Sequence, residues 1–313
     1  MSDFDVVHLV PRGGKSQLSS RSDVDLFSDM GIYPIISSPM AGVSGKDLVV
    51  GMAKNDCLGI YHRFDTYENR INDMKAIAYE MSFTAGDLYG VAIGIDNEQI
   101  ELGIADSAVH SYGASLLCVD IANGYLDKLL KYGERLRDLF PDTALMSGNI
   151  VTRKGADALF DAGFTFVRVG IGGGSHCTTR SVTGVGRNQL KALDECFDCD
   201  AYLVSDGGIR NSGDAVKSFA AGADFVMLGG ILAYANEADN DGWLYGMASA
   251  RNHNTMQKKL KSVEGRESQI DPDLKKPLKE ILENFTWGIK SGCTYLNAES
   301  YRDIRDNCDI EKD

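Results

Sequence analysis

The sequence predicts an α/β fold, a single (β/α)8 TIM barrel with an N-terminal extension and a mobile active-site loop after its eighth strand. Eight short apolar segments alternate with helix-like segments in one unbroken run along the 313 residues. Several of the apolar segments are continuous rather than alternating, as expected of parallel strands that are covered on both faces. Glycine and polar residues gather just after these segments, where barrels of this kind build their active sites.

Residues 1–33 precede the alternation, and we expect a polar, irregular extension there because Pro11, Gly13 and Gly14 interrupt any period. The apolar runs then predict strands, in order, at residues 33–38, 58–61, 89–95, 115–121, 143–146, 164–170, 201–205 and 224–228. Helices are expected between the strands, at residues 46–54, 66–84, 124–139, 153–162, 186–197 and 211–221 among others. In the helix at 124–139 the apolar residues recur on one face, which is the face expected to cover the sheet.

No linker interrupts this run, so we expect one domain over residues 1–313. It would include an active-site flap region at 236–275 and a C-terminal helical segment at 276–313. A doubly wound sheet is the competing fold. Its dinucleotide-binding pattern G-x-G-x-x-G is not met, since Gly170-x-Gly172-x-x-Ser175 ends in serine and follows the sixth strand.

The composition limits the function classes. A formal net charge of −13 argues against a nucleic-acid partner or an anionic membrane surface. No apolar run approaches the roughly 20 residues of a membrane span, and the acidic first residues do not resemble a signal peptide. The seven cysteines are an odd number and are expected to be free thiols, which favours a cytoplasmic protein. Cys196 and Cys199 have the spacing of a metal half-site, but no second pair follows to complete four ligands.

The glycine-rich stretch at 170–180 holds a single cysteine, Cys177, directly after the sixth strand. Glycines allow backbone N–H groups to converge on an anion, or carbonyl groups on a cation. A strand-to-loop turn with an incidental thiol is the alternative interpretation. Similar glycine and polar clusters follow the other strands, and they favour a catalytic role; these clusters lie at 38–40, 62–63, 120–124, 148–149, 206–208 and 229–230.

The types of residue in these clusters suggest a nucleotide-binding site. Gly207-Gly208 and Gly229-Gly230 follow the seventh and eighth strands, where TIM barrels commonly hold a phosphate on main-chain N–H groups, although tight turn packing is the alternative. Asp206 could accept hydrogen bonds from ribose hydroxyls, and Ser175 could add a hydroxyl. The base of a nucleoside monophosphate would then lie toward Cys177, whose thiolate can attack an electron-poor ring carbon.

On these residues the chain resembles the IMP dehydrogenase/GMP reductase superfamily and, within it, the GMP reductases. The central motifs are Gly172-x-Gly174-Ser175-x-Cys177-Thr178-Thr179-Arg180 and Ser205-Asp206-Gly207-Gly208. The resemblance runs nearly end to end and also covers residues 20–25, 62–64, 120–125, 147–152, 183–186, 225–230, 245–247 and 263–265. The dehydrogenases usually carry two CBS modules after the second strand and an Arg-Tyr pair in their flap. This chain has neither, which favours the reductases.

The resemblance implies a reaction and a set of site residues. Cys177 would attack C2 of GMP, ammonia would leave with help from Thr179 and Glu264, and the covalent thioimidate would accept a hydride from NADPH to give IMP. Implied substrate contacts are Met40, Ser175, Asp206, Gly207, Gly208, Gly229, Gly230, Tyr245, Met247, Ser249 and Gly265. Implied cofactor contacts are His62, Arg63, Asp120, Ala122, Asn123, Gly124 and Tyr125. The carbonyl groups of Gly172, Gly174 and Cys177 match the family's potassium loop, and family members form homotetramers.

Three alternatives stay open at this point. The chain could be an IMP dehydrogenase without CBS modules, oxidising IMP to XMP with NAD, or it could bind a purine nucleotide without catalysis. It could also prefer a related guanine nucleotide such as dGMP, since Lys261 and Val263 differ from the residues that many relatives carry in the base-contacting loop. The preference for NADPH over NADH is equally open. Glu264 also reads as a solvated charge in the polar segment 261–266.

Overall fold

The fold was analysed in a computed structural model, which describes residues 3–14, 18–82, 88–174, 177–246, 249 and 266–312. Eight parallel strands form one sheet in the order β2-β9-β8-β7-β6-β5-β4-β3. The strands are β2 (Ile35–Ser37), β3 (Gly59–Tyr61), β4 (Tyr89–Ile93), β5 (Leu116–Val119), β6 (Ala144–Ile150), β7 (Phe166–Val169), β8 (Tyr202–Asp206) and β9 (Phe225–Leu228). The two edges meet where Ser37 N donates to Leu58 O at 2.9 Å and Leu58 N donates to Ile35 O at 3.0 Å. The predicted TIM barrel is confirmed.

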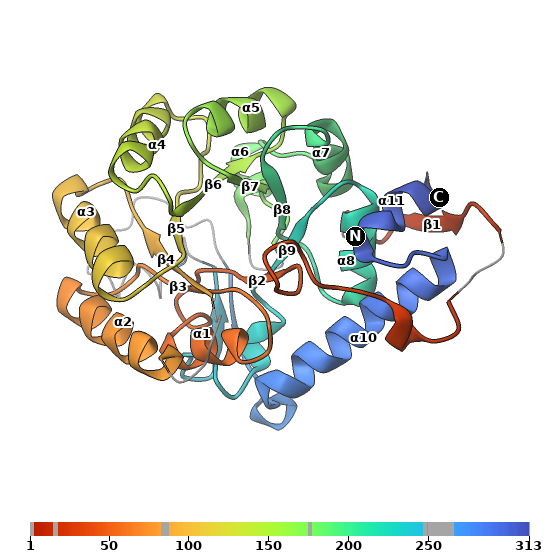
Figure 1. The fold of residues 1–313 in the computed structure, drawn as a ribbon, viewed down its shortest axis with the longest axis horizontal. Coiled ribbons are helices and arrows are strands. Elements are labelled where there is room, and N and C mark those ends of the chain that lie inside the picture. The colour runs from red at the N-terminus through yellow and green to blue at the C-terminus, as the bar shows by residue number, and fades with distance from the viewer. Residues whose placement is uncertain are drawn as a thin grey trace.

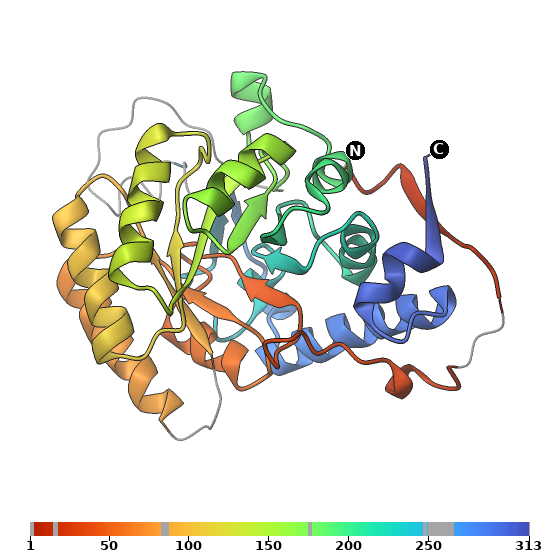
Figure 2. The ribbon, with the colours of Figure 1, turned by 45° about the horizontal axis from the view of Figure 1, so that its top comes forward.

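The helices form a ring outside the strands (Figures 1 and 2). They are α1 (Lys46–Ala53), α2 (Tyr67–Met81), α3 (Glu98–Asp106), α4 (Asp127–Leu139), α5 (Arg153–Asp161), α7 (Gln189–Cys196) and α8 (Ser212–Ala220), with the short α6 (Thr179–Thr183) before α7. Single helical turns occur at η1 (Arg21–Asp23), η2 (Ser107–Ser111), η3 (Leu232–Tyr234), η4 (Pro272–Leu274) and η5 (Tyr301–Asp303). The long helix α10 (Leu278–Leu296) packs on α8 and α1, and α11 (Ile304–Asn307) packs on α8.

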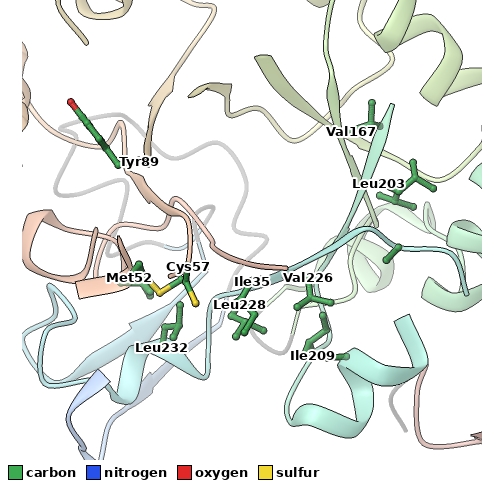
Figure 3. Close-up of a cluster of buried hydrophobic side chains, with 14 of the residues drawn as sticks. Ile35, Met52, Cys57, Tyr89, Val167, Leu203, Ile209, Val226, Leu228 and Leu232 are labelled. Atoms are coloured by element: carbon green, nitrogen blue, oxygen red, sulfur yellow. The ribbon is translucent and has the colours of Figure 1, made fainter. Parts of the chain in front are cut away.

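Side chains alternate between two buried layers along each strand, as the period of two requires. One layer fills the inside of the barrel and includes Ile36, Ile60, Leu116, Cys118, Met146, Phe166, Val204 and Phe225. The other layer packs between the strands and the helices, and Figure 3 shows part of it around Ile35, Met52 and Leu232. Because of this alternation, the side chains two positions after Cys118 in β5, Phe166 in β7 and Val204 in β8 also point toward the barrel interior. They lie at the carboxyl ends of the strands.

Two small sheets lie outside the barrel. The extension contains β1 (Val7–Pro11), which pairs antiparallel with β12 (Cys308–Lys312), so the segments expected to be irregular and helical each include a strand. A second pair, β10 (Trp243–Tyr245) with β11 (Glu267–Gln269), lies within residues 236–275, where a flap was predicted. Neither strand pair was predicted from the sequence, because the two partners of each pair are separated by other segments of the chain.

In the part of the chain that the structure describes, no helix is long and apolar enough to cross a membrane. Among the same residues, no three or more His, Cys, Asp or Glu side chains are grouped to hold a metal ion. The seven cysteines are free thiols.

Candidate functional site

A cavity of about 1230 Å³ opens at the carboxyl ends of the strands. This volume exceeds the roughly 300–1,000 Å³ of ordinary small-molecule sites, so the cavity has room for more than one mononucleotide-sized group. The loops after the strands bring together many of the residues that the sequence singled out. Those that line the cavity are Met40, Arg63, Asp120, Ala122, Gly172, Gly174, Cys177, Thr179, Asp206, Gly207, Gly208, Gly229 and Gly230.

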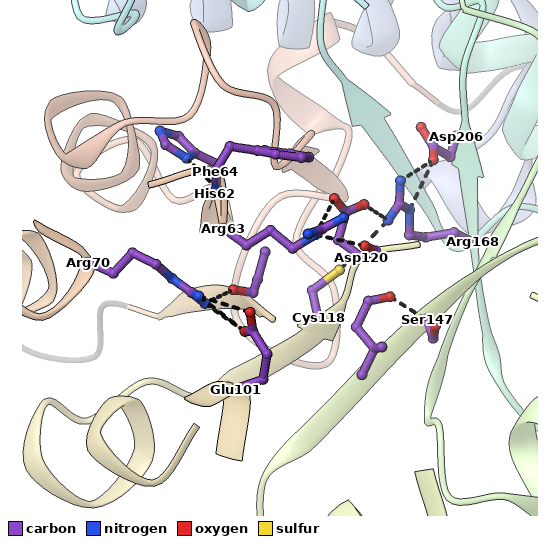
Figure 4. A network of polar contacts seen from close by, with 12 residues as sticks. His62, Arg63, Phe64, Arg70, Glu101, Cys118, Asp120, Ser147, Arg168 and Asp206 are labelled. Carbon is purple, nitrogen blue, oxygen red and sulfur yellow. Dashed lines mark hydrogen bonds and ion pairs between the residues drawn. The ribbon is translucent and has the colours of Figure 1, made fainter. Parts of the chain in front are cut away.

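The floor of the cavity is an ionic network centred on Arg168 of β7 (Figure 4). Its guanidinium contacts Asp120 Oδ1 at 2.7 Å through Nη1 and Asp206 Oδ2 at 2.9 Å through Nη2. All three side chains are nearly buried. Burial alone would lower the pKa of Arg168, but the two carboxylates outweigh it and raise that pKa above its ordinary value. The arginine therefore stays charged and fixes both carboxylates at the end of the barrel.

Asp206 has a second partner. Asn149 Nδ2 donates to Asp206 Oδ2 at 2.7 Å and to Gly170 O at 2.7 Å. One carboxylate oxygen is thus held from two sides, which orients the group beside the glycines that follow it. Asn149 was predicted to lie in a cluster after a strand, but neither Asn149 nor Arg168 was assigned to the site.

The glycines after β8 and β9 present bare backbone to the cavity. Gly207 and Gly208 have φ values of +106° and +87°, which favour glycine. A Cβ atom at Gly208 would lie 3.0 Å from Gly173 O, and one at Gly229 would lie 2.8 Å from Met40 Sδ. A side chain at either position would require its neighbours to move, whereas glycine lets the main chain approach a ligand closely, as a phosphate site requires.

Cys177 and Thr179 lie together on the loop that follows β7. The thiol Sγ donates to Thr179 Oγ1 at 3.1 Å, and Cys177 N donates to Gly174 O at 3.0 Å. Both side chains are half-buried and line the cavity. A hydroxyl in contact with a thiol at a cavity wall is suited to carry a proton to or from a group that the sulfur attacks.

The loop that carries Cys177 is held by Arg180. Its Nε donates to Ile171 O at 2.7 Å, and its Nη2 donates to Arg187 O, so one side chain ties the beginning of the loop to its end. Gly172, with φ of +72°, leaves room for this side chain, because a Cβ there would lie 2.4 Å from Arg180 Cγ. Arg180 was predicted only as part of the family motif.

Arg63 and His62, which were expected together at the cofactor, point in different directions. Arg63 lines the cavity, donates from Nε to Asp120 O at 2.9 Å and lies 4.6 Å from the centre of the Phe64 ring. The His62 side chain is buried away from the cavity, where Nδ1 accepts from Phe64 N at 3.1 Å. Its Nε2 lies 3.9 Å from Asp239 Oδ2, and this interaction lowers the pKa of that carboxyl.

Other expected cofactor residues support the neighbouring loops and do not line the cavity. Gly124 N donates to Asn149 O at 3.1 Å, and the Tyr125 hydroxyl accepts from Val151 N at 2.9 Å. Asn123 Oδ1 accepts from Tyr125 N within the same loop.

Two expected substrate residues also lie outside the lining. Tyr245 is buried against Ala41 and Phe64, and Ser249 is buried with its N–H on Gly246 O at 2.9 Å. The remaining predicted site residues fall outside the described part of the chain; they are Ser175, Met247, Glu264 and Gly265.

Comparisons with known proteins agree on one family. The family model described as "IMP dehydrogenase / GMP reductase domain" matches residues 2–312. The chain is 32% identical over 320 residues to a GMP reductase of Buchnera aphidicola subsp. Acyrthosiphon pisum (strain Tuc7), covering 94% of this chain and 89% of that protein. It is 30% identical over 330 residues to a GMP reductase of Caenorhabditis elegans, covering 96% and 89%. A GMP reductase of Enterobacter sp. (strain 638) is 32% identical over 322 residues, covering 94% and 90%.

Proposed function

This chain belongs to the IMP dehydrogenase/GMP reductase family, and we propose that it catalyses the NADPH-dependent reductive deamination of GMP to IMP and ammonia. The observation that carries the proposal is the contact of 3.1 Å between Cys177 Sγ and Thr179 Oγ1 at the wall of a nucleotide-sized cavity. The names of the relatives above favour the reductase over the dehydrogenase.

The glycine backbone and Asp206 hold the nucleotide in this proposal. Main-chain N–H groups at Gly207, Gly208, Gly229 and Gly230 would bind the 5′-phosphate, since all four residues line the cavity and none has a side chain to cover its N–H group. The Asp206 carboxylate would accept from ribose hydroxyls, because Arg168 and Asn149 already orient it toward the cavity. The purine then extends toward Cys177.

Cys177 acts as the nucleophile. Its thiolate forms a bond from Sγ to C2 of the guanine ring, and the bond from C2 to the amino nitrogen breaks as that nitrogen takes up a proton and leaves as ammonia. Thr179 relays this proton, and Glu264 supplies it. A hydride added at C2 then displaces the thiolate, which frees IMP and regenerates Cys177.

The described residues suit a nicotinamide cofactor. The cavity is larger than one nucleotide requires, and Arg63, Asp120 and Ala122 line it. When bound, NADPH supplies the hydride. The Arg63 side chain is held at the cavity wall by its hydrogen bond to Asp120 O and by its contact with the Phe64 ring. It is therefore suited to orient the cofactor's polar groups.

The same proposal includes a potassium ion, a homotetramer and a cytoplasmic location, all implied by the family resemblance. Gly174 O accepts from Cys177 N and keeps a second lone pair for a cation. Comparing activity in potassium and sodium salts tests the ion, and the mass in solution tests the assembly.

The purified protein should consume NADPH only when GMP is added, with IMP and ammonia formed in equal amounts. Cys177→Ala should abolish turnover and still bind GMP, because the phosphate and ribose contacts lie on other loops. NAD reduction with IMP, or faster turnover of dGMP, would instead support one of the alternative activities. GMP binding without turnover by the wild type would refute catalysis.

A further inference from the structure

The first described residues of the chain form part of the cavity wall, although they precede the barrel by some thirty residues. Asp3 and Phe4 both line the cavity, and Phe4 is fully buried. A Cβ at Gly208 would lie 3.2 Å from the Phe4 ring, so the aromatic side chain supports the glycine turn from behind. Neither Asp3 nor Phe4 was predicted to belong to the site.

The segment of residues 3–5 is fixed to the barrel along its whole length. Asn188 Nδ2 donates to Asp3 O at 3.4 Å, Lys217 Nζ donates to Phe4 O at 2.9 Å, and Arg210 Nη2 contacts Asp5 Oδ1 at 2.5 Å. The strand pairing of β1 with β12 follows immediately. Its position beside the cavity is therefore determined by several independent contacts.

Asp3 contacts the loop that carries Cys177 where the Arg180 side chain joins the two ends of this loop. Its Oδ2 accepts from Arg180 Nη1 at 2.8 Å and from Gln189 N, the first residue of α7, at 2.9 Å. Arg180 in turn binds Ile171 O and Arg187 O at the two ends of the loop. The Asp3 side chain is 20% exposed and that of Arg180 is 31% exposed, so water only partly screens their attraction.

From these contacts we propose that Asp3 is a positioning residue for Cys177, acting through Arg180. This inference rests on the proposed role of Cys177 as nucleophile. The Asp3 carboxylate compensates the guanidinium charge and fixes its plane, so that the guanidinium can hold both ends of the loop. Without the carboxylate, Arg180 turns toward water, the loop opens, and the Cys177–Thr179 pair leaves its reactive geometry.

The test compares Asp3→Asn with Asp5→Asn. The asparagine at position 3 keeps the size of the side chain and an acceptor for Gln189 N, and it removes only the charge. Asp5→Asn removes the ion pair with Arg210 from the same segment and leaves both contacts of the Asp3 carboxylate in place. For Asp3→Asn, kcat should fall about 10- to 100-fold with little change in the KM for GMP, as expected when a reactive group is misplaced. Asp5→Asn should behave as the wild type, and Asp3→Glu should recover part of the loss.

A second measurement does not depend on the reaction. The rate at which iodoacetamide alkylates Cys177 is followed by mass spectrometry, with the half-buried Cys199 in the same protein as the reference thiol. In Asp3→Asn the Cys177 rate should rise severalfold relative to Cys199. An unchanged ratio would overturn the inference, whether or not kcat falls, because a merely structural role would alter both thiols or neither. If the wild type does not reduce GMP, the proposed function fails while the alkylation ratio still decides the role of Asp3.

Discussion

Replacing Arg168 by methionine should destabilise the protein more than any exposed substitution. The variant keeps most of the side-chain volume but leaves Asp120 and Asp206 facing each other without their shared cation. These carboxylates are only 12% and 14% exposed. Removing one partner of a buried ion pair costs about 3–5 kcal/mol.

The structure favours the lower end of that range. Arg63 Nε remains 3.5 Å from Asp120 Oδ2, and Asn149 still donates to Asp206. We therefore expect the free energy of unfolding to fall by about 3 kcal/mol, which for a chain of 313 residues corresponds to a lower melting temperature by roughly 5 °C.

Urea unfolding of the wild type, Arg168→Met and Arg168→Lys measures the effect. Lysine carries the charge but cannot bridge two carboxylates with a planar group, so its loss should be intermediate. Adding Asp120→Asn and Asp206→Asn to Arg168→Met should recover stability, because the uncompensated charges disappear. A loss below about 1 kcal/mol for Arg168→Met, the range of a surface pair, would refute the reasoning, as would a triple variant less stable than Arg168→Met.

Three further predictions concern proton transfer, the glycines that follow β8, and the dependence of stability on pH. Glu264→Gln should slow GMP reduction on the order of 100-fold, whereas the reverse hydride transfer from IMP should suffer less; equal steady-state rates would make Glu264 a surface charge. Gly208→Ala should lower the free energy of unfolding by about 1–2 kcal/mol because of its positive φ, and it should raise the KM for GMP more than it lowers kcat. Since the folded-state pKa of Asp239 is lowered, the wild type should be more stable than Asp239→Asn above about pH 4. That difference, followed by unfolding at several pH values, should vanish as the pH falls through the folded-state pKa.

The barrel was predictable because its signals are local. A continuous apolar run such as that of β9 predicts a strand whatever the rest of the chain does, and the eight runs left few alternatives. The pairing of β1 with β12 was not, since Val7 meets Lys312 across almost the whole chain. No local pattern identifies a partner at that distance.

The site was predictable as a set of loops, but not as a set of side chains. Arg168 could have been found by its interruption of an apolar strand, in phase with the interior residue Phe166. The direction of His62 could not, because β3 ends at Tyr61 and the alternation of the strand no longer fixes the residues beyond it. Asp3 reaches the site only through tertiary contacts.

The pairing of β1 with β12 also fixes an order of events during synthesis. Lys312 leaves the ribosome after every barrel strand, so the barrel can close before residues 7–11 acquire their partner. Joining such distant segments in an unfolded chain would cost about 3 kcal/mol more than closing a loop thirty times shorter. The closed barrel removes that difference by bringing the two segments near each other. We therefore expect the barrel to bind residues 3–5 first, through Asn188, Lys217 and Arg210, and β12 to pair with residues 7–11 afterwards.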